Sequence, residues 1–278
     1  MTKHRAEVQA APGDPSIAVA QFAPGSDPAA NAARLRALAE RAARRGAGLV
    51  VFPEYSSFFA PTLGRDFVDA AQPIHGHFIE AVADVAADLG VLIVVGLVEQ
   101  IDDPNRFSNT LVALSDQGEF LSAYRKLHLY DAFGDRESEW VRPGPIEAPR
   151  TFHFEGFTVG LQTCYDLRFP EVTRRLADAG VDLVLVPSEW VRGPLKEHHW
   201  RTLVTARALE NTLYVAAADH MPPVGVGNSM IVDPMGVELA TVGETEGVGV
   251  AEISLARVEE VRAINPALEL RRFRVTTR

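Results

Sequence analysis

Residues Thr158–Pro170, TVGLQTCYDLRFP, form the stretch that decides the fold, and they hold Cys164, the only cysteine among 278 residues. The apolar, β-branched run before the thiol predicts a buried strand that stops at Cys164, and the Pro170-Glu171 pair predicts a helix start. We therefore expect the thiol at a strand end. A lone cysteine is typical of core packing, but its polar neighbours here are typical of a site that supports a thiolate.

Composition excludes several classes of function. The chain carries 37 acidic against 27 basic side chains, a formal charge of −10, which disfavours binding to nucleic acid or to an anionic membrane. Its hydrophobic content of 47% is enough for a sizeable core, and no apolar run has the length of a membrane span. Residues 1–14 are expected to be a mobile tail without a signal segment. Together with the single cysteine, this predicts a cytoplasmic protein.

Strands and helices alternate in the first half of the chain. Apolar runs predict strands, and Ala- and Leu-rich stretches that stop at a glycine predict helices. A hairpin with its turn at 116–118 follows. The expected order is strand 17–22, helix 28–45, strand 49–52, loop 56–66, helix 75–89, strand 91–97, and the hairpin strands 109–114 and 120–128. Such an alternation predicts sheets covered by helices.

The second half repeats this order. IAVAQFA at 17–23 matches TVGLQTC at 158–164, and GAGLVVFPE at 46–54 matches GVDLVLVPS at 180–188. The helix at 197–209, the strand at 214–218 and GNSMIVDPMG at 227–236 also have counterparts in the first half. Two such halves predict an α/β fold with an internal pseudo-two-fold repeat, in which two sheets pack face to face with helices outside. We expect these four layers to form one domain, residues 15–278, with its site at strand ends between the sheets.

Three charged residues lie where apolar strands end or are crossed. Glu54 ends one strand, Lys126 lies in FLSAYRKLHL, and Glu137 follows in the loop DAFGDRES. Glu54 and Lys126 are compatible with a structural salt bridge, and Glu137 with a solvated loop acid. Together with Cys164, however, the three make a chemically sufficient set, because a thiol that is mostly protonated at neutral pH needs a base.

These residues predict a route for attack on an amide. Glu54 takes the proton of Cys164, and the ammonium of Lys126 with the backbone N–H of Tyr165 stabilises the tetrahedral oxyanion. Glu54 then returns the proton to leaving ammonia and activates the water that hydrolyses the thioester.

Over residues 15–270 the chain resembles the nitrilase superfamily of carbon–nitrogen hydrolases. The resemblance rests on FPE at 52–54, YRKLHL at 124–129 and CYDLRFPE at 164–171, in the order Glu, Lys, Cys. It implies the αββα sandwich with internal pseudo-symmetry, with Glu54 as general base, Lys126 as oxyanion and positioning residue, and Cys164 as nucleophile. It also implies that Glu137 orients the substrate and the lysine.

Within that superfamily, the chain looks most similar to the branch of omega-amidases and other small-amide hydrolases. The similarity makes Arg168 a candidate anchor for a substrate carboxylate, with a salt bridge to Asp166 or Glu171 as the alternative. Three aromatic residues at corresponding strand ends either line the pocket or pack in the core: Tyr55, Tyr130 and Trp190. Adjacent histidines at 198–199 point in different directions on a helix, so we expect neither a metal nor another cofactor.

The leading prediction is a thiol amidase that splits small amides, carboxylate-bearing or aliphatic, into acid and ammonia. The context Cys164-Tyr165-Asp166 favours amides over nitriles, and N-carbamoyl amino acids stay open as substrates of the same machinery. A catalytically idle binding protein is the alternative from another class, and a redox sensor lacks a resolving cysteine. The partners are then a small amide and water. The resemblance further implies a homodimer or higher homo-oligomer, with contacts through the helix after Cys164 and through residues 264–278.

Overall fold

The computed structural model describes residues 13–277, which build two six-stranded mixed sheets. In the first sheet the inner neighbours β1, β2 and β3 are parallel, and each flanking strand is antiparallel to the strand it pairs with. Its order is β12 (Gly247–Glu252), β1 (Ser16–Gln21), β2 (Ala47–Val51), β3 (Leu92–Gln100), β4 (Phe107–Leu114) and β5 (Phe120–Arg125).

The second sheet has the same topology. Its inner strands are again parallel, and each flanking strand is antiparallel to its neighbour. The order is β6 (Thr151–Phe154), β7 (Phe157–Leu161), β8 (Leu183–Pro187), β9 (Tyr214–Ala218), β10 (Met230–Val232) and β11 (Glu238–Thr241). Strand for strand this matches the first sheet, which confirms the predicted repeat.

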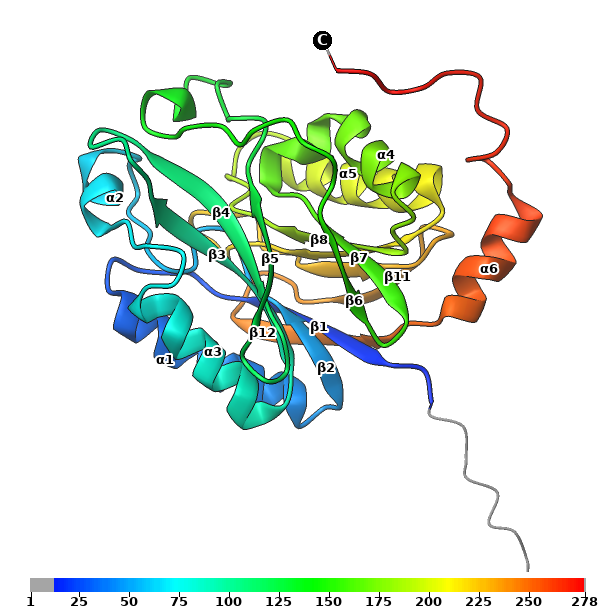
Figure 1. Cartoon of the computed structure of the whole chain (residues 1–278), viewed down its shortest axis with the longest axis horizontal. Helices are drawn as coiled ribbons and strands as arrows, with labels where there is room; N and C mark the ends of the chain where they lie inside the picture. Colours follow the sequence, from blue (N-terminus) through cyan, green and yellow to red (C-terminus); the bar gives the residue numbers. More distant parts are fainter. Residues whose placement is uncertain (1–12, 278) are drawn as a thin grey trace, which may run out of the picture.

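Helices cover the outer faces of both sheets (Figure 1). The first sheet packs on α1 (Pro28–Ala43) and α3 (His77–Leu89), and the second on α4 (Pro170–Asp178) and α5 (Lys196–Asn211). The helices begin and end where local chemistry dictates: Asp27 accepts N–H bonds at the start of α1, and Gly90 ends α3 at a φ of 62°. Between the sheets lies a core made by both, with Val19 and Leu49 from one and Leu161 and Leu185 from the other. The structure therefore confirms the αββα sandwich.

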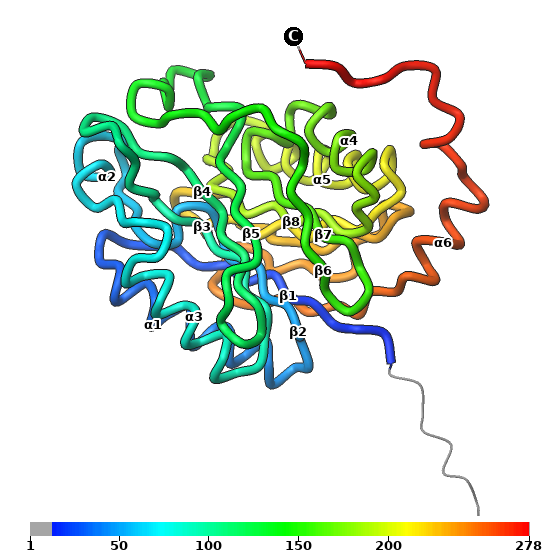
Figure 2. The backbone as a smooth tube through the Cα atoms, in the orientation of Figure 1, coloured from blue at the N-terminus to red at the C-terminus, as the bar shows by residue number. Residues whose placement is uncertain are grey.

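Several elements differ from the predicted ones. The expected loop 56–66 is followed by a short helix, α2 (Arg65–Ala70), and the hairpin strand expected to reach residue 128 ends at Arg125, so Lys126 lies just beyond it. Strands β6, β11 and β12 and helix α6 (Leu255–Ile264) were not predicted. After α6 the chain leaves the layers (Figure 2), and Arg271 there pairs with Asp178 at the end of α4.

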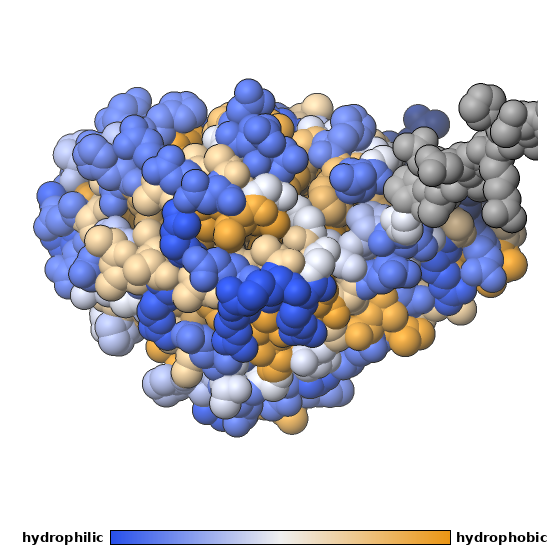
Figure 3. All heavy atoms as spheres, turned by 90° about the horizontal axis from the view of Figure 1, so that it is seen from below, coloured by the Kyte–Doolittle hydropathy of each residue, from blue (hydrophilic) through white to orange (hydrophobic). Residues whose placement is uncertain are grey.

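Three expectations concern the ends and the surface. The tail expected at 1–14 lies, for residues 1–12, outside the described part of the chain, and the single-domain boundary 15–278 stays a prediction. Within residues 13–277 no helix combines the length and the apolar character needed to cross a bilayer. The face drawn in Figure 3 is largely hydrophilic, with smaller hydrophobic patches between the polar groups.

Candidate active site

The four predicted site residues converge at one edge of the sandwich, beyond the ends of strands from both sheets. Glu54 lies three residues after β2, and Lys126 directly follows β5. Cys164 begins the 3-10 helix η2 (Cys164–Arg168) shortly after β7, and Glu137 begins the 3-10 turn η1 (Glu137–Glu139). All four are buried, with at most 6% of each residue exposed.

A buried charge network joins the three charged residues. The Lys126 ammonium donates to Glu54 Oε1 at 2.9 Å and to Glu137 Oε1 at 3.0 Å. The alternative of a solvated Glu137 is wrong, because only 4% of this residue is exposed. Glu54 and Lys126 do form an ion pair, as the structural alternative also required. One cation between two carboxylates leaves a net negative charge inside the protein, which is a costly arrangement without further donors.

Two such donors are Asn109, which the sequence analysis did not name, and Tyr55, for which it predicted no hydrogen bond. Asn109 Nδ2 donates to Glu54 Oε1 at 2.6 Å and to Glu137 Oε1 at 3.2 Å. The Tyr55 hydroxyl donates to Glu137 Oε1 at 2.7 Å, whereas Tyr55 was expected to line the pocket or to pack in the core. An asparagine in an apolar strand, Phe107–Leu114, was the signal for the first, since a buried amide requires partners.

The other oxygen and the backbone of Glu54 are held by the second sheet. The N–H of Glu189, just after β8, donates to Glu54 Oε2 at 2.6 Å. His220, just after β9, places its Nε2 2.6 Å from the Glu54 carbonyl oxygen. Burial lowers the pKa of His220 to about 4, so its imidazole is neutral and its Nε2–H donates. Both halves of the repeat thus fix the same carboxylate.

Cys164 lies in a strained, well-supported turn. Its φ is 43°, in the left-handed region that non-glycine residues rarely adopt. The thiol donates to the Glu189 carbonyl oxygen at 3.4 Å. At the start of η2, Thr163 and Asp166 form a capping box. The first N–H groups of such a helical turn, including that of Tyr165, have no partner within the turn. A backbone donor is therefore available next to the thiol.

Asp166 ties this turn to the strand that carries Lys126, a link that sequence reasoning missed. Its Oδ2 accepts from the Tyr124 hydroxyl at 2.7 Å, and its Oδ1 from the His128 backbone N–H at 3.1 Å. Tyr124 and His128 each lie two residues from Lys126. The carboxylate therefore sets the thiol turn and the lysine at a fixed separation across the two sheets.

Electrostatics at the site favour a protonated thiol beside a basic carboxylate. Burial raises the pKa of Cys164 well above its ordinary value, and Glu54 adds to the rise against the opposing Lys126. Burial also raises the pKa of Glu54, although Lys126 lowers it. For Lys126 burial acts downward, but Glu137 and Glu54 outweigh it and the pKa is raised well above the ordinary value. The lysine keeps its charge, and a carboxylate with a raised pKa is a better proton acceptor.

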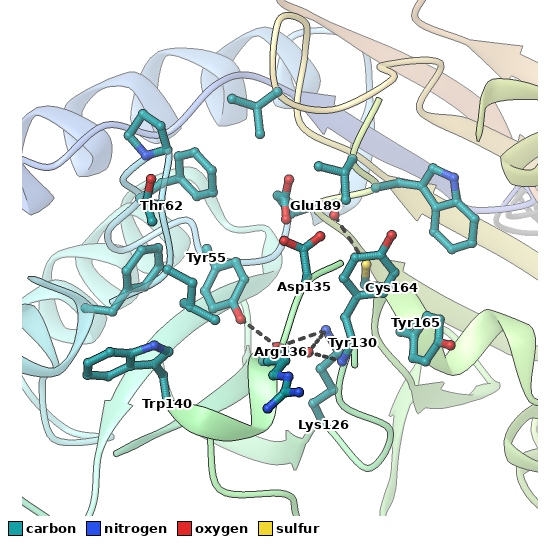
Figure 4. A pocket seen from close by; sticks show the side chains of 18 of the residues that line it. Tyr55, Thr62, Lys126, Tyr130, Asp135, Arg136, Trp140, Cys164, Tyr165 and Glu189 are labelled. Carbon is teal, nitrogen blue, oxygen red and sulfur yellow. Dashed lines mark hydrogen bonds and ion pairs between the residues drawn. The ribbon is translucent and has the colours of Figure 1, made fainter. Parts of the chain in front are cut away.

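Lys126, Glu137 and Cys164 border a cavity of about 450 Å³. Figure 4 shows Lys126, Cys164 and Glu189 directed into it, with Tyr55 and Trp140 on the opposite wall. The four substrate-binding candidates, Tyr55, Tyr130, Arg168 and Trp190, line this cavity, and so does Tyr165, which was expected to supply a backbone donor. Trp190 also packs on Trp200 with ring centroids 5.6 Å apart, so for this residue pocket lining and core packing both hold.

Arg168 makes neither of the salt bridges considered for it. Among residues 13–277, Asp166 pairs with His128 instead, and no carboxylate lies within 4.0 Å of the Arg168 guanidinium. Its closest polar partner is His199, with Nη2 3.3 Å from the ring Nδ1. The salt bridges considered for Arg168 are therefore absent among the described residues, and the residue lines the cavity, so its role as a carboxylate anchor stays a prediction.

In the part of the chain that the structure describes, no group of three or more His, Cys, Asp or Glu side chains is placed so that it could hold a metal ion. The rings of His198 and His199 lie 6.3 Å apart and tilted by 54°. That the protein works without a metal or another cofactor stays a prediction.

Comparison with known families identifies the chain. A model of the family described as carbon-nitrogen hydrolase matches residues 16–263. The chain belongs to this family. A protein of Escherichia coli O157:H7 named deaminated glutathione amidase is 40% identical over 263 residues, 92% of this chain and 97% of that protein. The human protein of the same name is 32% identical over 275 residues, 93% of this chain and 82% of the relative.

Two solved structures have the same fold as this chain. The NitFhit protein of C. elegans superposes with a TM-score of 0.85 at 30% identity, over 94% of this chain and 66% of that chain. An amidase from Nesterenkonia sp. gives a TM-score of 0.75 at 28% identity, over 94% of this chain and 98% of the other. These findings confirm the predicted nitrilase superfamily and its fold. The chain is an amide-hydrolysing enzyme, with an amide and water as its reactants.

Proposed function

We propose that this carbon-nitrogen hydrolase is a thiol amidase that splits small amides, carboxylate-bearing or aliphatic, through an acyl-thioester on Cys164. One observation carries the proposal: the thiol borders the same cavity as an ammonium held at 2.9 Å from Glu54, whose pKa is raised by burial. A nucleophile, a base and a fixed cation are the groups that acyl transfer requires.

Acylation follows from these positions. Cys164 Sγ bonds to the carbonyl carbon while its proton passes to Glu54, so no free thiolate is needed in spite of the raised thiol pKa. The oxyanion is held by Lys126 Nζ and by the Tyr165 N–H. The C–N bond then breaks, Glu54 gives the proton to the leaving ammonia, and the acyl group stays on sulfur.

Deacylation uses the same groups in reverse. Glu54 takes a proton from water, the resulting hydroxide oxygen bonds to the thioester carbon, and the thiol recovers its proton as the acid leaves. Glu137 touches Lys126 and not the thiol, so its role is to keep the ammonium charged and in place. Relatives named deaminated glutathione amidase support an amide as substrate, and deaminated glutathione is one candidate for this chain.

The test is ammonia release over a panel of small amides, omega-amides, deaminated glutathione, N-carbamoyl amino acids and nitriles. We expect amides to be turned over and Cys164→Ala to be inactive. Mass spectrometry of the acyl-enzyme is unambiguous, because the chain has one cysteine. Full activity of Cys164→Ala would overturn the thiol mechanism. Turnover of nitriles or carbamoyl compounds alone would favour those substrates, and a reactive thiol without any turnover would favour an idle binding protein.

The proposal includes a cytoplasmic homodimer or higher homo-oligomer. A single cysteine supports a reducing compartment. Exposed apolar side chains in and after α6 support contacts between copies, since Ile264, Leu270 and Phe273 are 67%, 71% and 89% exposed. Sedimentation of the full chain tests this part, and a monomer at micromolar concentration would contradict it.

A further inference from the structure

Asp219, the first residue after β9, is a buried acid that the steps above do not use. None of the residue is exposed to solvent. By the register of the parallel strands, its counterpart in the other half is Leu97 in β3, which is also fully buried. An apolar side chain thus fills the equivalent position, so packing alone does not require an acid here. A buried carboxyl group is costly unless its oxygens bind donors.

One carboxyl oxygen of Asp219 binds the backbone beside the thiol. Its Oδ1 accepts from the Trp190 N–H at 2.6 Å. The Trp190 nitrogen belongs to the same peptide group as the Glu189 carbonyl, and that carbonyl oxygen accepts from the Cys164 thiol at 3.4 Å (Figure 4). Because a trans peptide group is planar, its N–H and C=O point in opposite directions. Asp219 and the thiol therefore bind the two ends of one peptide group.

The neighbouring peptide group holds the proposed base. The N–H of Glu189 donates to Glu54 Oε2 at 2.6 Å. The two peptide groups that flank Glu189 thus contact the two residues between which the proposed proton transfer takes place. A rotation of this backbone would displace the hydrogen-bond partner of the nucleophile, and it would disturb the partner of the base as well.

The backbone of Asp219 is itself fixed from the first sheet. Its N–H donates to Ser229 Oγ at 2.9 Å, and Ser229 Oγ donates to Gln21 Oε1 at 2.8 Å. Gln21 is the last residue of β1, and neither it nor Ser229 is exposed. Buried polar groups that are linked in this way have one arrangement rather than several. The carboxyl group of Asp219 is therefore held in place on the side away from the thiol.

The surroundings of Asp219 favour its neutral form. Burial raises its pKa well above the ordinary value, against the opposing Trp190 N–H, and Glu189 and Glu54 add to the rise. Among residues 13–277 its Oδ2 has no hydrogen-bond partner. A neutral carboxyl group still accepts from the Trp190 N–H through Oδ1. It does so without bringing another negative charge near Glu54.

We propose that Asp219 is a positioning residue for the thiol: by accepting from the Trp190 N–H it orients the peptide group whose carbonyl oxygen holds Cys164. The inference rests on the proposed function, because the orientation of the thiol matters for turnover only if Cys164 is the nucleophile. Asp219 touches neither the thiol nor the cavity, so it acts through the backbone. An acceptor at the place of Oδ1 is then sufficient, and no ionised carboxylate is needed.

The experiment compares two substitutions that differ in this acceptor. Asp219→Asn keeps an oxygen for the Trp190 N–H, so kcat on butyramide should stay within about threefold of that of the unaltered protein. Asp219→Ala leaves the Trp190 N–H buried without a partner, and kcat should fall about 10- to 100-fold. KM should change less than about threefold in both, because neither substitution alters a side chain that lines the cavity.

The chain offers a matched control in Asp233, which follows β10 in the same half. Asp233 is 5% exposed, and its Oδ1 accepts from the backbone N–H groups of Met235 at 2.8 Å and Val237 at 2.9 Å. Asp233→Ala therefore removes a buried acceptor of backbone donors at a turn away from the thiol. We expect it to lower the midpoint of urea unfolding as Asp219→Ala does, with kcat unchanged.

The reactivity of the thiol gives a readout that does not need turnover. Mass spectrometry follows alkylation by iodoacetamide without ambiguity, because the chain has one cysteine. At pH 7 and 25 °C we expect the alkylation rate to fall about tenfold in Asp219→Ala and to stay unchanged in Asp219→Asn and Asp233→Ala. A role of Asp219 in stability alone would leave this rate unchanged in all the folded variants.

The outcomes separate this inference from the proposed function. Unchanged kcat and alkylation rate in Asp219→Ala would overturn the positioning role and leave the thiol amidase intact. Equal losses in Asp219→Asn and Asp219→Ala would also overturn it, because the ionised carboxylate would then be required. If butyramide is not turned over, or Cys164→Ala keeps its turnover, the alkylation rates alone decide the inference. Should Asp219→Ala fail to fold, Asp219→Leu, which copies the residue of the other half, carries the same comparison.

Discussion

The two halves of the molecule have the same topology, but the residues at their equivalent strand ends differ in chemical character. In the repeat, Glu54 after β2 corresponds to Ser188 after β8, and Cys164 after β7 corresponds to Ala23 after β1. Each half thus places one reactive group where the other has a small, uncharged side chain. The first half supplies the buried charges, and the second supplies the nucleophile and backbone donors. Because Glu54 holds the Lys126 ammonium, which borders the same cavity as Cys164, neither half has a complete site by itself.

The test with the largest expected effect compares one substitution in each half, at a pair of equivalent positions. Glu54→Gln keeps the shape and most hydrogen bonds but removes the base, so we expect kcat/KM to fall by about 10²–10⁴. Ser188→Ala is the matched control. It loses only a 3.4 Å hydrogen bond to the Val186 carbonyl, and activity should change less than about fivefold. Steady-state ammonia release measures both. Similar losses for the two variants would break the asymmetry between the halves.

The second test concerns the charges of the first half. Lys126→Met removes the cation between Glu54 and Glu137, so we expect a loss of about 3–5 kcal/mol in the free energy of unfolding. Activity should fall about 10²–10³-fold with the lost oxyanion donor. Adding Glu137→Gln removes one of the two unpaired carboxylates and should recover part of the stability, measured by urea unfolding, but none of the activity. Recovered activity in the double variant would mean that Lys126 only neutralises charge.

A third test compares the halves at the equivalent strands β3 and β9 through the pH dependence of stability. By the register of the sheets, His220 after β9 corresponds to Val98 in β3. Burial lowers the pKa of His220 from 6.5 to about 4, so above pH 6.5 the residue is neutral in both folded and unfolded chains. As pH falls below 6.5 the unfolded chain takes up a proton that the folded protein does not. Stability is therefore lost on acidification, by about 2 kcal/mol between about pH 7 and pH 5.

Two matched variants show whether this pH dependence comes from His220. His220→Gln keeps a donor for the Glu54 carbonyl but does not titrate, so its free energy of unfolding should depend less on pH by about that amount. His153→Gln, on an exposed residue of β6, should retain the dependence of the unaltered protein. Urea unfolding at several pH values measures all three proteins. Parallel curves for His220→Gln and the unaltered protein would show that the imidazole titrates normally.

Much of the division of the site between the two halves could be predicted from the sequence. The rest was hidden for physical reasons. Apolar periodicity located the strands of both halves, and strand ends located Glu54 and Cys164. The glycine-rich strand Gly247–Glu252 lacked a continuous apolar pattern, which hid β12. Lys196 stands in the polar run KEHH, which is typical of a solvated helix start, although the fold buries it.

Contacts between the halves were hidden for a different reason. Asp166 stands in a recognisable motif, but its partner Tyr124 is 42 residues away and in the other sheet. Nothing in the local pattern of either segment indicates such a pairing, because strand packing across the sandwich has no fixed sequence separation. His220 and Glu54 are 166 residues apart for the same reason.

A single methyl group distinguishes another equivalent pair, Gly96 in β3 and Ala218 in β9. A Cβ at Gly96 would lie 2.5 Å from Tyr55 N and 2.7 Å from Glu54 Cα, too close for either backbone to stay in place. The second half has room for the methyl group of Ala218 at the equivalent position. The first half thus needs glycine because the chain turns sharply at Tyr55, with a φ of 55°, to present Glu54.

Gly96→Ala should therefore lower the free energy of unfolding by about 1–3 kcal/mol, as overpacking does. It should also lower kcat, because the displaced backbone carries Glu54, the proposed base. Ala218→Gly is the mirror variant and should cost about 0.5–1 kcal/mol through backbone entropy alone, with kcat unchanged. If Gly96→Ala loses stability but keeps its kcat, the position of Glu54 is set by its contacts with Asn109, Glu189 and His220 rather than by close packing on β3.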